Sequence, residues 1–87
     1  MATVWIPSLM RDLVAGRERV DAPGRTVGEV VDALDGVYPG IRDRLCEGER
    51  IAPVLMVWVD GRVARLGLLE AIGEQSEIHF LPAVAGG

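Results

Sequence analysis

The chain has 87 residues, of which 49% are apolar and 25% are charged, and its formal net charge is -4. A domain of this size buries only about 60–65% of the surface that its unfolded chain exposes, which leaves little room for both a core and a deep catalytic cavity. The size therefore argues against a self-contained enzyme. The acidic balance argues against nucleic-acid binding, which needs clustered positive charge, and favours a basic protein partner.

The residue types that are missing or rare exclude further classes. All nine basic residues are arginine, so there is no lysine for a Schiff base or a phosphate-binding loop. The single cysteine, Cys46, cannot form a disulfide within the chain, whereas small secreted domains stapled by disulfides need two or more. No signal peptide is evident, and the longest apolar run, residues 54–59, is far shorter than the roughly 20 residues that span a bilayer. We expect a cytoplasmic protein that binds neither membrane nor nucleic acid.

Two strands are predicted in the first part of the chain. Residues 3–9 are rich in β-branched and aromatic side chains, and Pro7 indicates a strand end, a bulge or a sheet edge. Residues 18–22 alternate, with Val20 and Ala22 on one face. We expect the two strands to pair as a hairpin, joined by a long loop over residues 10–17 that leaves the register open.

A helix is predicted to begin at a capping box. Thr26 and Glu29 are spaced so that the hydroxyl and the carboxylate each bind a free backbone N–H group at the helix start. Gly36 is a natural stop, which gives a helix of about ten residues. The branched side chains after the capping box recur at helical spacing and form one apolar stripe: Val27, Val30, Val31 and Leu34.

A second, shorter helix is predicted beyond the first one. Pro39 suits its first turn, where the missing N–H group costs nothing. Ile41 and Leu45 follow one turn apart, and the charged residues between them form a solvated face.

The last third of the chain is predicted to be mostly strands. The strongest strand signal is residues 54–59, which a hairpin turn at Asp60 connects to residues 62–66. A short helical turn over residues 68–72 follows. Residues 77–81 alternate as a further strand, which Pro82 closes because it has no N–H group to donate.

This order of elements predicts an α+β domain. Two strands, a helix, a short helix and two or three more strands, joined by a right-handed crossover, give a mixed four- to five-stranded sheet with one main helix packed on one face. The pattern is that of a β-grasp, ubiquitin-like domain. We expect the domain to comprise residues 1–82 and a flexible C-terminal tail to comprise residues 83–87, because the tail has no periodicity and no large side chain to anchor it.

Candidate catalytic groups are too few for a recognisable active site. His79 is the only histidine, Cys46 the only cysteine, and Ser8 and Ser76 the only serines, with no signature around any of them. The carboxylates have no metal-ligand spacing. We expect no bound metal and no bound cofactor, with His79 on an exposed strand face and Cys46 as a small buried filler.

The di-glycine at the end of the sequence is the strongest functional signal. An extended arm of five residues reaches roughly 17 Å, and glycine has no Cβ to obstruct a narrow channel. The Gly87 carboxylate has a reference pKa of about 3.5, so it is ionised at neutral pH and can attack the α-phosphate of ATP in the active site of another protein. The alternative is that residues 83–87 are a frayed end without function.

Several stretches together resemble the ubiquitin-like sulfur carriers of the MoaD/ThiS superfamily. The sequence LPAVAGG at residues 81–87 is similar to the C-terminus of these carriers, above all of the carrier in thiocarboxylate-dependent cysteine biosynthesis. Further similar stretches span essentially the whole chain: Ile6-Pro7-Ser8, Gly24 with residues 26–30, residues 38–41 with Arg44-Leu45, and residues 57–60.

The resemblance implies a protein co-substrate and not an enzyme. A ubiquitin-activating-type adenylyltransferase would consume ATP to adenylate Gly87, which would become a thiocarboxylate with Gly86 beside it. A sulfur-accepting synthase would then take the sulfur for cysteine or a related metabolite, with a sulfurtransferase or a product-releasing metalloprotease as a further partner. Two alternatives stay open: the small subunit of molybdopterin synthase, and a ubiquitin-like protein modifier.

Strand parity predicts where such partners dock. Successive side chains of a strand point to opposite faces of the sheet. If one alternate set faces the helix, the other set lies together on the uncovered face. Exposed apolar patches that contain tryptophan and methionine mark interfaces, although the tryptophans could instead pack under residues 10–17. The expected partner-binding residues on the sheet are Trp5, Met56, Trp58, His79 and Leu81, continued along the tail by Pro82, Ala83, Val84 and Ala85.

Overall fold

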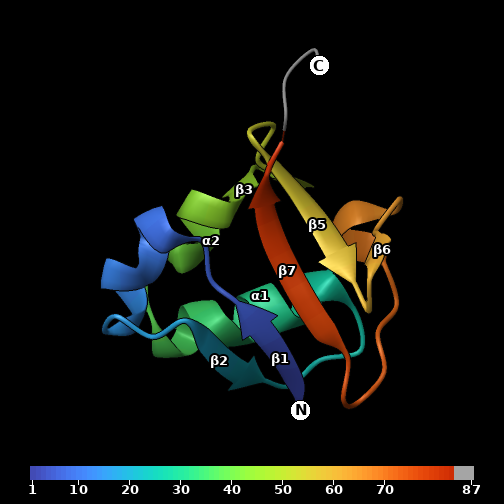
Figure 1. Ribbon diagram of the computed structural model, residues 1–87, viewed down its shortest axis with the longest axis horizontal. Coiled ribbons are helices and arrows are strands. Elements are labelled where there is room, and N and C mark those ends of the chain that lie inside the picture. Colours follow the sequence, from blue (N-terminus) through green and yellow to red (C-terminus); the bar gives the residue numbers. More distant parts are fainter. Residues whose placement is uncertain (84–87) are drawn as a thin grey trace.

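The computed structural model describes residues 1–83 as seven strands, two α-helices and two 3-10 helices (Figure 1). Five strands form the main sheet, and β3 and β4 form a separate small hairpin. Within residues 1–83, no helix is long and apolar enough to cross a membrane. The elements are β1 (Ala2–Trp5), η1 (Ser8–Val14), β2 (Arg19–Ala22), α1 (Val27–Val37), α2 (Ile41–Leu45), β3 (Cys46–Glu47), β4 (Arg50–Ile51), β5 (Leu55–Val59), β6 (Arg62–Val63), η2 (Gly67–Leu69) and β7 (Glu77–Pro82).

The main sheet has the order β2-β1-β7-β5-β6 and is mixed. Strand β1 pairs antiparallel with β2 and parallel with β7, and β5 pairs antiparallel with both β7 and β6. The parallel pair at the centre requires the crossover through α1 that the element order predicted. The β-grasp prediction, with its mixed sheet of up to five strands, is confirmed.

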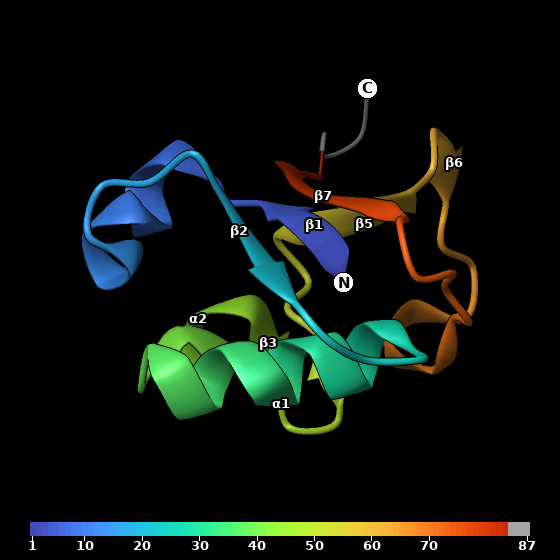
Figure 2. The same ribbon diagram turned by 90° about the horizontal axis from the view of Figure 1, so that it is seen from below.

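Helix α1 covers one face of this sheet (Figure 2). Its predicted apolar stripe is confirmed, since Val27, Val30, Val31 and Leu34 are each at most 1% exposed. The sheet contributes every second residue to the same core, and these residues include Val4, Val57, Ile78 and Phe80. A single core between helix and sheet therefore fixes which face of each strand is left uncovered.

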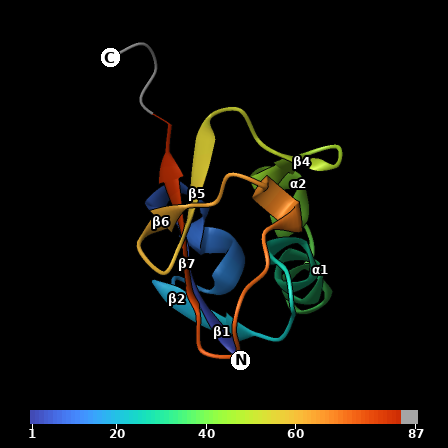
Figure 3. The ribbon, with the colours of Figure 1, turned by 90° about the vertical axis from the view of Figure 1, so that its right-hand side faces the viewer.

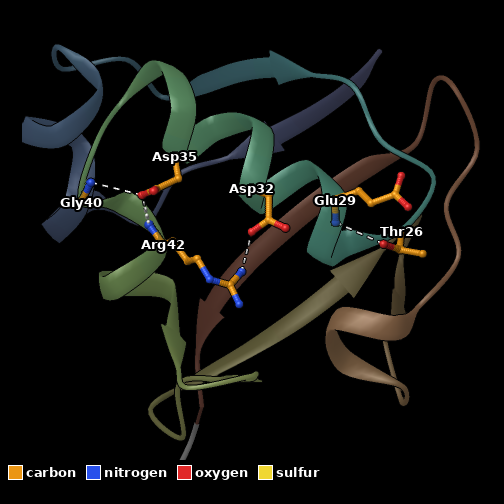
Figure 4. A network of polar contacts seen from close by, with 6 residues as sticks. All are labelled: Thr26, Glu29, Asp32, Asp35, Gly40 and Arg42. Carbon is orange, nitrogen blue, oxygen red and sulfur yellow. Dashed lines mark hydrogen bonds and ion pairs between the residues drawn. The ribbon is translucent and has the colours of Figure 1, made fainter.

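The start of α1 is held by the predicted cap (Figure 4). The Thr26 hydroxyl accepts a hydrogen bond from the backbone N–H of Glu29 over 3.1 Å. The Glu29 carboxylate accepts from the N–H of Arg25 over 3.0 Å, one residue before the position that a standard capping box uses. Gly24 packs against this turn so closely that a Cβ there would lie 2.7 Å from the Val30 nitrogen. The chain must therefore enter α1 through a glycine.

The end of α1 is joined to α2 by a polar network (Figure 4). The Asp35 carboxylate accepts from the backbone N–H groups of Gly40 and Arg42, over 3.1 and 3.0 Å. The Arg42 guanidinium pairs with Asp32 over 2.8 Å. These contacts start α2 at Ile41, so the prediction that Pro39 lies in its first turn is wrong.

Three other predictions of local structure are wrong. Strand β1 ends at Trp5 instead of residue 9, because the chain turns at Pro7 into η1, which also replaces much of the expected 10–17 loop. Helix α1 passes Gly36 and ends at Val37. Strand β6 contains only Arg62 and Val63, because the chain then turns toward η2. Helix η2 begins at Gly67 and overlaps only the first two residues of the helical turn expected over residues 68–72.

The turn after β5 is tied to the start of β7. Asp60 has a positive φ of 50°, and its carboxylate accepts from the Glu77 N–H and from the Ser76 hydroxyl, each over 2.8 Å. The hydrogen bond from Glu77, with that from Ser76, lowers the pKa of the Asp60 carboxyl below its usual value. Ser76 is itself buried and accepts from the Gly73 N–H over 2.8 Å, so its role is structural.

Candidate docking face and C-terminal tail

The uncovered face of the sheet carries one continuous row of side chains. Register places Trp5 beside Arg19 on one side and beside His79 on the other. His79 lies directly opposite Trp58, which in turn lies opposite Val63. The row crosses all five strands, with one tryptophan on each side of the central histidine.

Trp5 is fixed in this row by three neighbours. Its ring stacks on His79 with centroids 5.3 Å apart and planes 6° from parallel. The Arg19 guanidinium lies over the ring at 5.4 Å, and the indole Nε1 donates to the Glu77 carboxylate over 3.0 Å. Such stacking and cation–π contacts orient an aromatic side chain even where water reaches it. Trp5 is therefore held in place before any partner arrives.

A second apolar row continues the face toward the end of β7, where Met56 pairs with Leu81. We call Trp5, Met56, Trp58, His79 and Leu81 together the docking face. Four of them are half-buried, and Leu81 is 44% exposed. The sequence-based prediction that these side chains share one face, opposite the core, agrees with this register.

An apolar pocket of about 510 Å³ adjoins the docking face at the C-terminal end of β7. Sequence reasoning missed most of its lining, above all Leu9 and Val54, which are 84% and 69% exposed. Pro7 brings Leu9 there by turning the chain out of β1, and the signal for this was the proline inside an apolar run. The wall is formed mainly by Trp5, Pro7, Leu9, Val54, Leu81 and Pro82.

Strand β7 ends at Pro82, which belongs to the lining of this pocket, and Figure 3 shows β7 running beside β5 to this end. The Ala83 N–H donates to the Val54 carbonyl over 2.8 Å, which holds the last described residue beside the start of β5. The predicted partner-binding residues Pro82 and Ala83 thus adjoin the docking face. The remaining predicted site residues lie outside the described part of the chain: Val84, Ala85, Gly86 and Gly87.

The nucleophilic and titratable groups are not brought together. Cys46 is buried at the end of α2, and burial raises the pKa of its thiol, so it is poorly suited to nucleophilic chemistry. His79 stacks on Trp5, and Ser76 bonds to Asp60. Among residues 1–83, no three His, Cys, Asp or Glu side chains are grouped so as to hold a metal ion. The arrangement is suited to binding a protein surface.

Comparison with known proteins identifies the family. The model of the ThiS family matches residues 4–87, nearly the whole chain. The chain belongs to the ThiS family. The resemblance that the sequence motifs suggested is thereby confirmed.

Two curated proteins are similar to this chain over most of its length. The chain is 34% identical to the sulfur carrier protein CysO of Mycobacterium tuberculosis over 90 residues, which cover 98% of this chain and 97% of that protein. It is 36% identical to small archaeal modifier protein 3 of Haloferax volcanii over 64 residues, which cover 71% and 70% of the two chains.

Solved structures show the same fold. A chain in the crystal structure of the Amycolatopsis orientalis BexX/CysO complex superposes with a TM-score of 0.90 at 34% identity, with both chains fully covered. The crystal structure of Mycobacterium tuberculosis CysO gives a TM-score of 0.89 at 31% identity and covers 97% of this chain and 100% of that one. The fold of these solved structures is therefore the fold of residues 1–83 of this chain.

Proposed function

We propose that this protein is a sulfur carrier that serves partner enzymes as a co-substrate. The observation that carries the proposal is its similarity, over nearly the full length of both chains, to a protein named as a sulfur carrier. The Gly86-Gly87 pair supports it, because it offers a carboxylate on a slender arm. The separated His, Cys and Ser side chains of the domain agree with a protein that supplies no catalytic group of its own.

The chemistry is assigned to the Gly87 carboxylate. In the activating enzyme, this carboxylate attacks the α-phosphate of ATP and pyrophosphate leaves, which gives an acyl adenylate. Sulfide then attacks the acyl carbon, AMP leaves and a proton is released, so the carboxylate becomes a thiocarboxylate. The carrier consumes ATP only inside its partner and needs no bound cofactor.

The domain contributes by docking and aiming the tail. Trp5, Trp58 and their neighbours form a preordered apolar surface, which lowers the entropy cost of association. The pocket at the end of β7 lies where Ala83 leads the chain away, so a partner that fills it is placed beside the tail. The net charge of -4 favours approach to a basic surface.

The proposed partners are a ubiquitin-activating-type adenylyltransferase and a sulfur-accepting synthase, with cysteine or a related sulfur compound as the product. A crystal structure in which CysO is in complex with BexX supports the expectation that carriers of this kind form complexes with other proteins. A sulfurtransferase that supplies the sulfur and a metalloprotease that releases the product complete the proposal, and the cytoplasm is its proposed location.

Intact-mass spectrometry tests the function directly. The protein is incubated with ATP, an activating enzyme and a sulfide source. We expect a mass gain equal to the exchange of one oxygen for sulfur, absent without ATP and absent in a variant that lacks Gly87. An unchanged mass with an enzyme that converts a known carrier, or sulfur gained without Gly87, contradicts the proposal.

A second candidate function is protein modification through the same carboxylate. The 36% identity to a small archaeal modifier protein favours it. Since this chain has no lysine, it cannot form chains of itself through lysine side chains, and every lysine conjugate must join it to another protein. Denaturing electrophoresis of a tagged protein in cell extract with ATP would show discrete, Gly87-dependent conjugates under this alternative.

A further inference from the structure

The edge of the sheet at β2 lies away from the docking face and has features of its own. Within the described residues, β2 is the outermost strand, with β1 on one side and no strand on the other (Figure 1). An outermost strand presents backbone N–H and C=O groups that another strand can pair with. The edge is thus a template for a further strand.

The register shows which backbone groups point outward. The Ile6 N–H donates to the Glu18 carbonyl over 2.9 Å, so the backbone groups of Glu18 point toward β1. Because these groups alternate along a strand, those of Val20 also point toward β1. The N–H and C=O groups of Arg19 and Asp21 point to the open side.

We infer that a second copy of this chain pairs with β2 in an antiparallel manner about a two-fold axis at Val20. In this register, Arg19 of each copy lies opposite Asp21 of the other, and each such pair exchanges two backbone hydrogen bonds. The result joins two five-stranded sheets into one continuous sheet.

The charges of Arg19 and Asp21 favour this register and favour a second copy of the chain as the pairing partner. Arg19 and Asp21 are both exposed on the outer face of β2, so pairing about Val20 sets opposite charges against each other twice. Pairing centred on Arg19 or on Asp21 would instead set like charges directly opposite each other, which is destabilising. The strand is therefore complementary to itself in one antiparallel register.

The inner side of the same edge is apolar. A groove of about 310 Å³ runs between β2 and α1 and is lined by Val20, Leu34, Val37 and Tyr38 among others. Val37 is 68% exposed. Figure 2 shows how β2 passes beside α1 at this edge. Pairing places Val20 of the second copy next to Val20 over this groove, which removes apolar surface from water.

Arg19 and Asp21 already make contacts within their own copy, and these contacts leave both side chains able to form the charge pairs. Asp21 Oδ1 accepts from the Thr3 hydroxyl over 3.0 Å, which leaves Oδ2 for the second copy. Arg19 lies over the Trp5 ring at 5.4 Å. Moving its guanidinium toward Asp21 of the second copy breaks this contact, which costs little because Arg19 is exposed.

The geometry leaves the proposed carrier surface accessible. Because β7 is parallel to β1 and β1 is antiparallel to β2, the two β7 strands of the pair run in opposite directions. Their C-terminal ends, and the pockets beside them, therefore lie at opposite ends of the joined sheet. The inference does not depend on the sulfur-carrier proposal, and its test measures association only.

Sedimentation equilibrium over a wide concentration series tests the inference. We expect a reversible shift from the 9.4 kDa monomer toward the dimer mass. Asp21→Arg sets like charges opposite each other at two places and should weaken the dimer about tenfold. The double variant Arg19→Asp with Asp21→Arg restores opposite charges and should restore the dimer. Glu49→Arg, with the same change of net charge at an exposed turn of the separate β3–β4 hairpin, should not weaken it.

Two sedimentation results would overturn the inference. One is a monomer at all concentrations, and the other is a dimer that Asp21→Arg leaves intact or that the double variant fails to rescue. Thermal unfolding of each variant shows that it is folded. Amide NMR shifts on dilution should centre on Arg19 and Asp21, and shifts centred on Trp58 would assign self-association to the docking face instead. If only an unrelated extended peptide shifts these amides, the edge takes a different occupant and the inference is wrong.

Discussion

The two faces of the main sheet are built from the same strands and do different work. On the inner face, Val57, Ile78 and Phe80 are at most 3% exposed and pack on the core. On the outer face, Trp58 and His79 alternate with them and stay half-buried. Burial of apolar surface makes the inner face the main source of folding free energy, while the outer face keeps apolar surface for a partner. Substitutions on the two faces should therefore separate stability from binding.

The largest expected effect is on the inner face, at Phe80. Phe80→Ala removes a side chain that is 2% exposed and leaves a cavity in the core. We expect a loss of about 3–5 kcal/mol in the free energy of unfolding, a large part of the roughly 5–15 kcal/mol of a typical domain. Urea unfolding followed by circular dichroism measures it. A loss below about 1 kcal/mol would show that the inner face is not the main source of stability.

The next effect is on the outer face, at Trp58. Trp58→Ala removes a central aromatic side chain of the docking face and should weaken binding to the activating enzyme about tenfold or more, because aromatic anchors dominate interfaces. Its free energy of unfolding should fall by less than about 1 kcal/mol, as at other surface sites. Thr3→Ala, on the same face but outside the docking face, is the matched control. Calorimetry that finds unchanged affinity for Trp58→Ala would remove this face from the interface.

The division between the faces was predictable from sequence because it rests on a period of two. In β7, the alternation places Ile78 and Phe80 on the core face and His79 and Leu81 on the outer face. The burial pattern of the structure agrees with this assignment. The cap at Thr26 was predictable for a similar reason, since it depends on residues three apart. Local spacing thus gave the strands, the helix and the fold.

The surroundings of the docking face were not predictable, because they depend on where loops travel. The run before Met10 looks like strand, yet the chain leaves the sheet at Pro7 and carries Leu9 to the pocket at the end of β7. Val54 belongs to the apolar run at residues 54–59, but β5 begins only at Leu55. Val54 therefore lies outside the strand and lines the pocket. The two-residue strands β3 and β4 have no periodicity to detect.

A smaller effect is expected at Asp60, in the turn after β5 that is tied to the start of β7. Its carboxylate accepts from Glu77 and Ser76, and the resulting lowered pKa means that the ionised form stabilises the fold at pH above about 4. This contribution is lost as the pH falls through the lowered pKa. Asp60→Asn should cost about 1 kcal/mol at neutral pH, and the gap to the natural protein should close in acid. Urea midpoints across pH 2–7 measure it, and a gap that widens in acid would contradict the assignment.

The smallest effect tests whether the docking face is ordered in advance, and it concerns Glu77. Glu77 holds the Trp5 indole by one exposed hydrogen bond of 3.0 Å, so Glu77→Ala should cost only about 0.5 kcal/mol of stability. Freed from this bond, Trp5 must be ordered again when a partner binds, so affinity should fall a few-fold, by about 0.5–1 kcal/mol. Glu77→Gln keeps an oxygen that can accept from the indole and should restore affinity, measured by titration with the activating enzyme. If Gln and Ala lower the affinity alike, Glu77 acts through its charge, and the order of Trp5 comes from its contacts with His79 and Arg19.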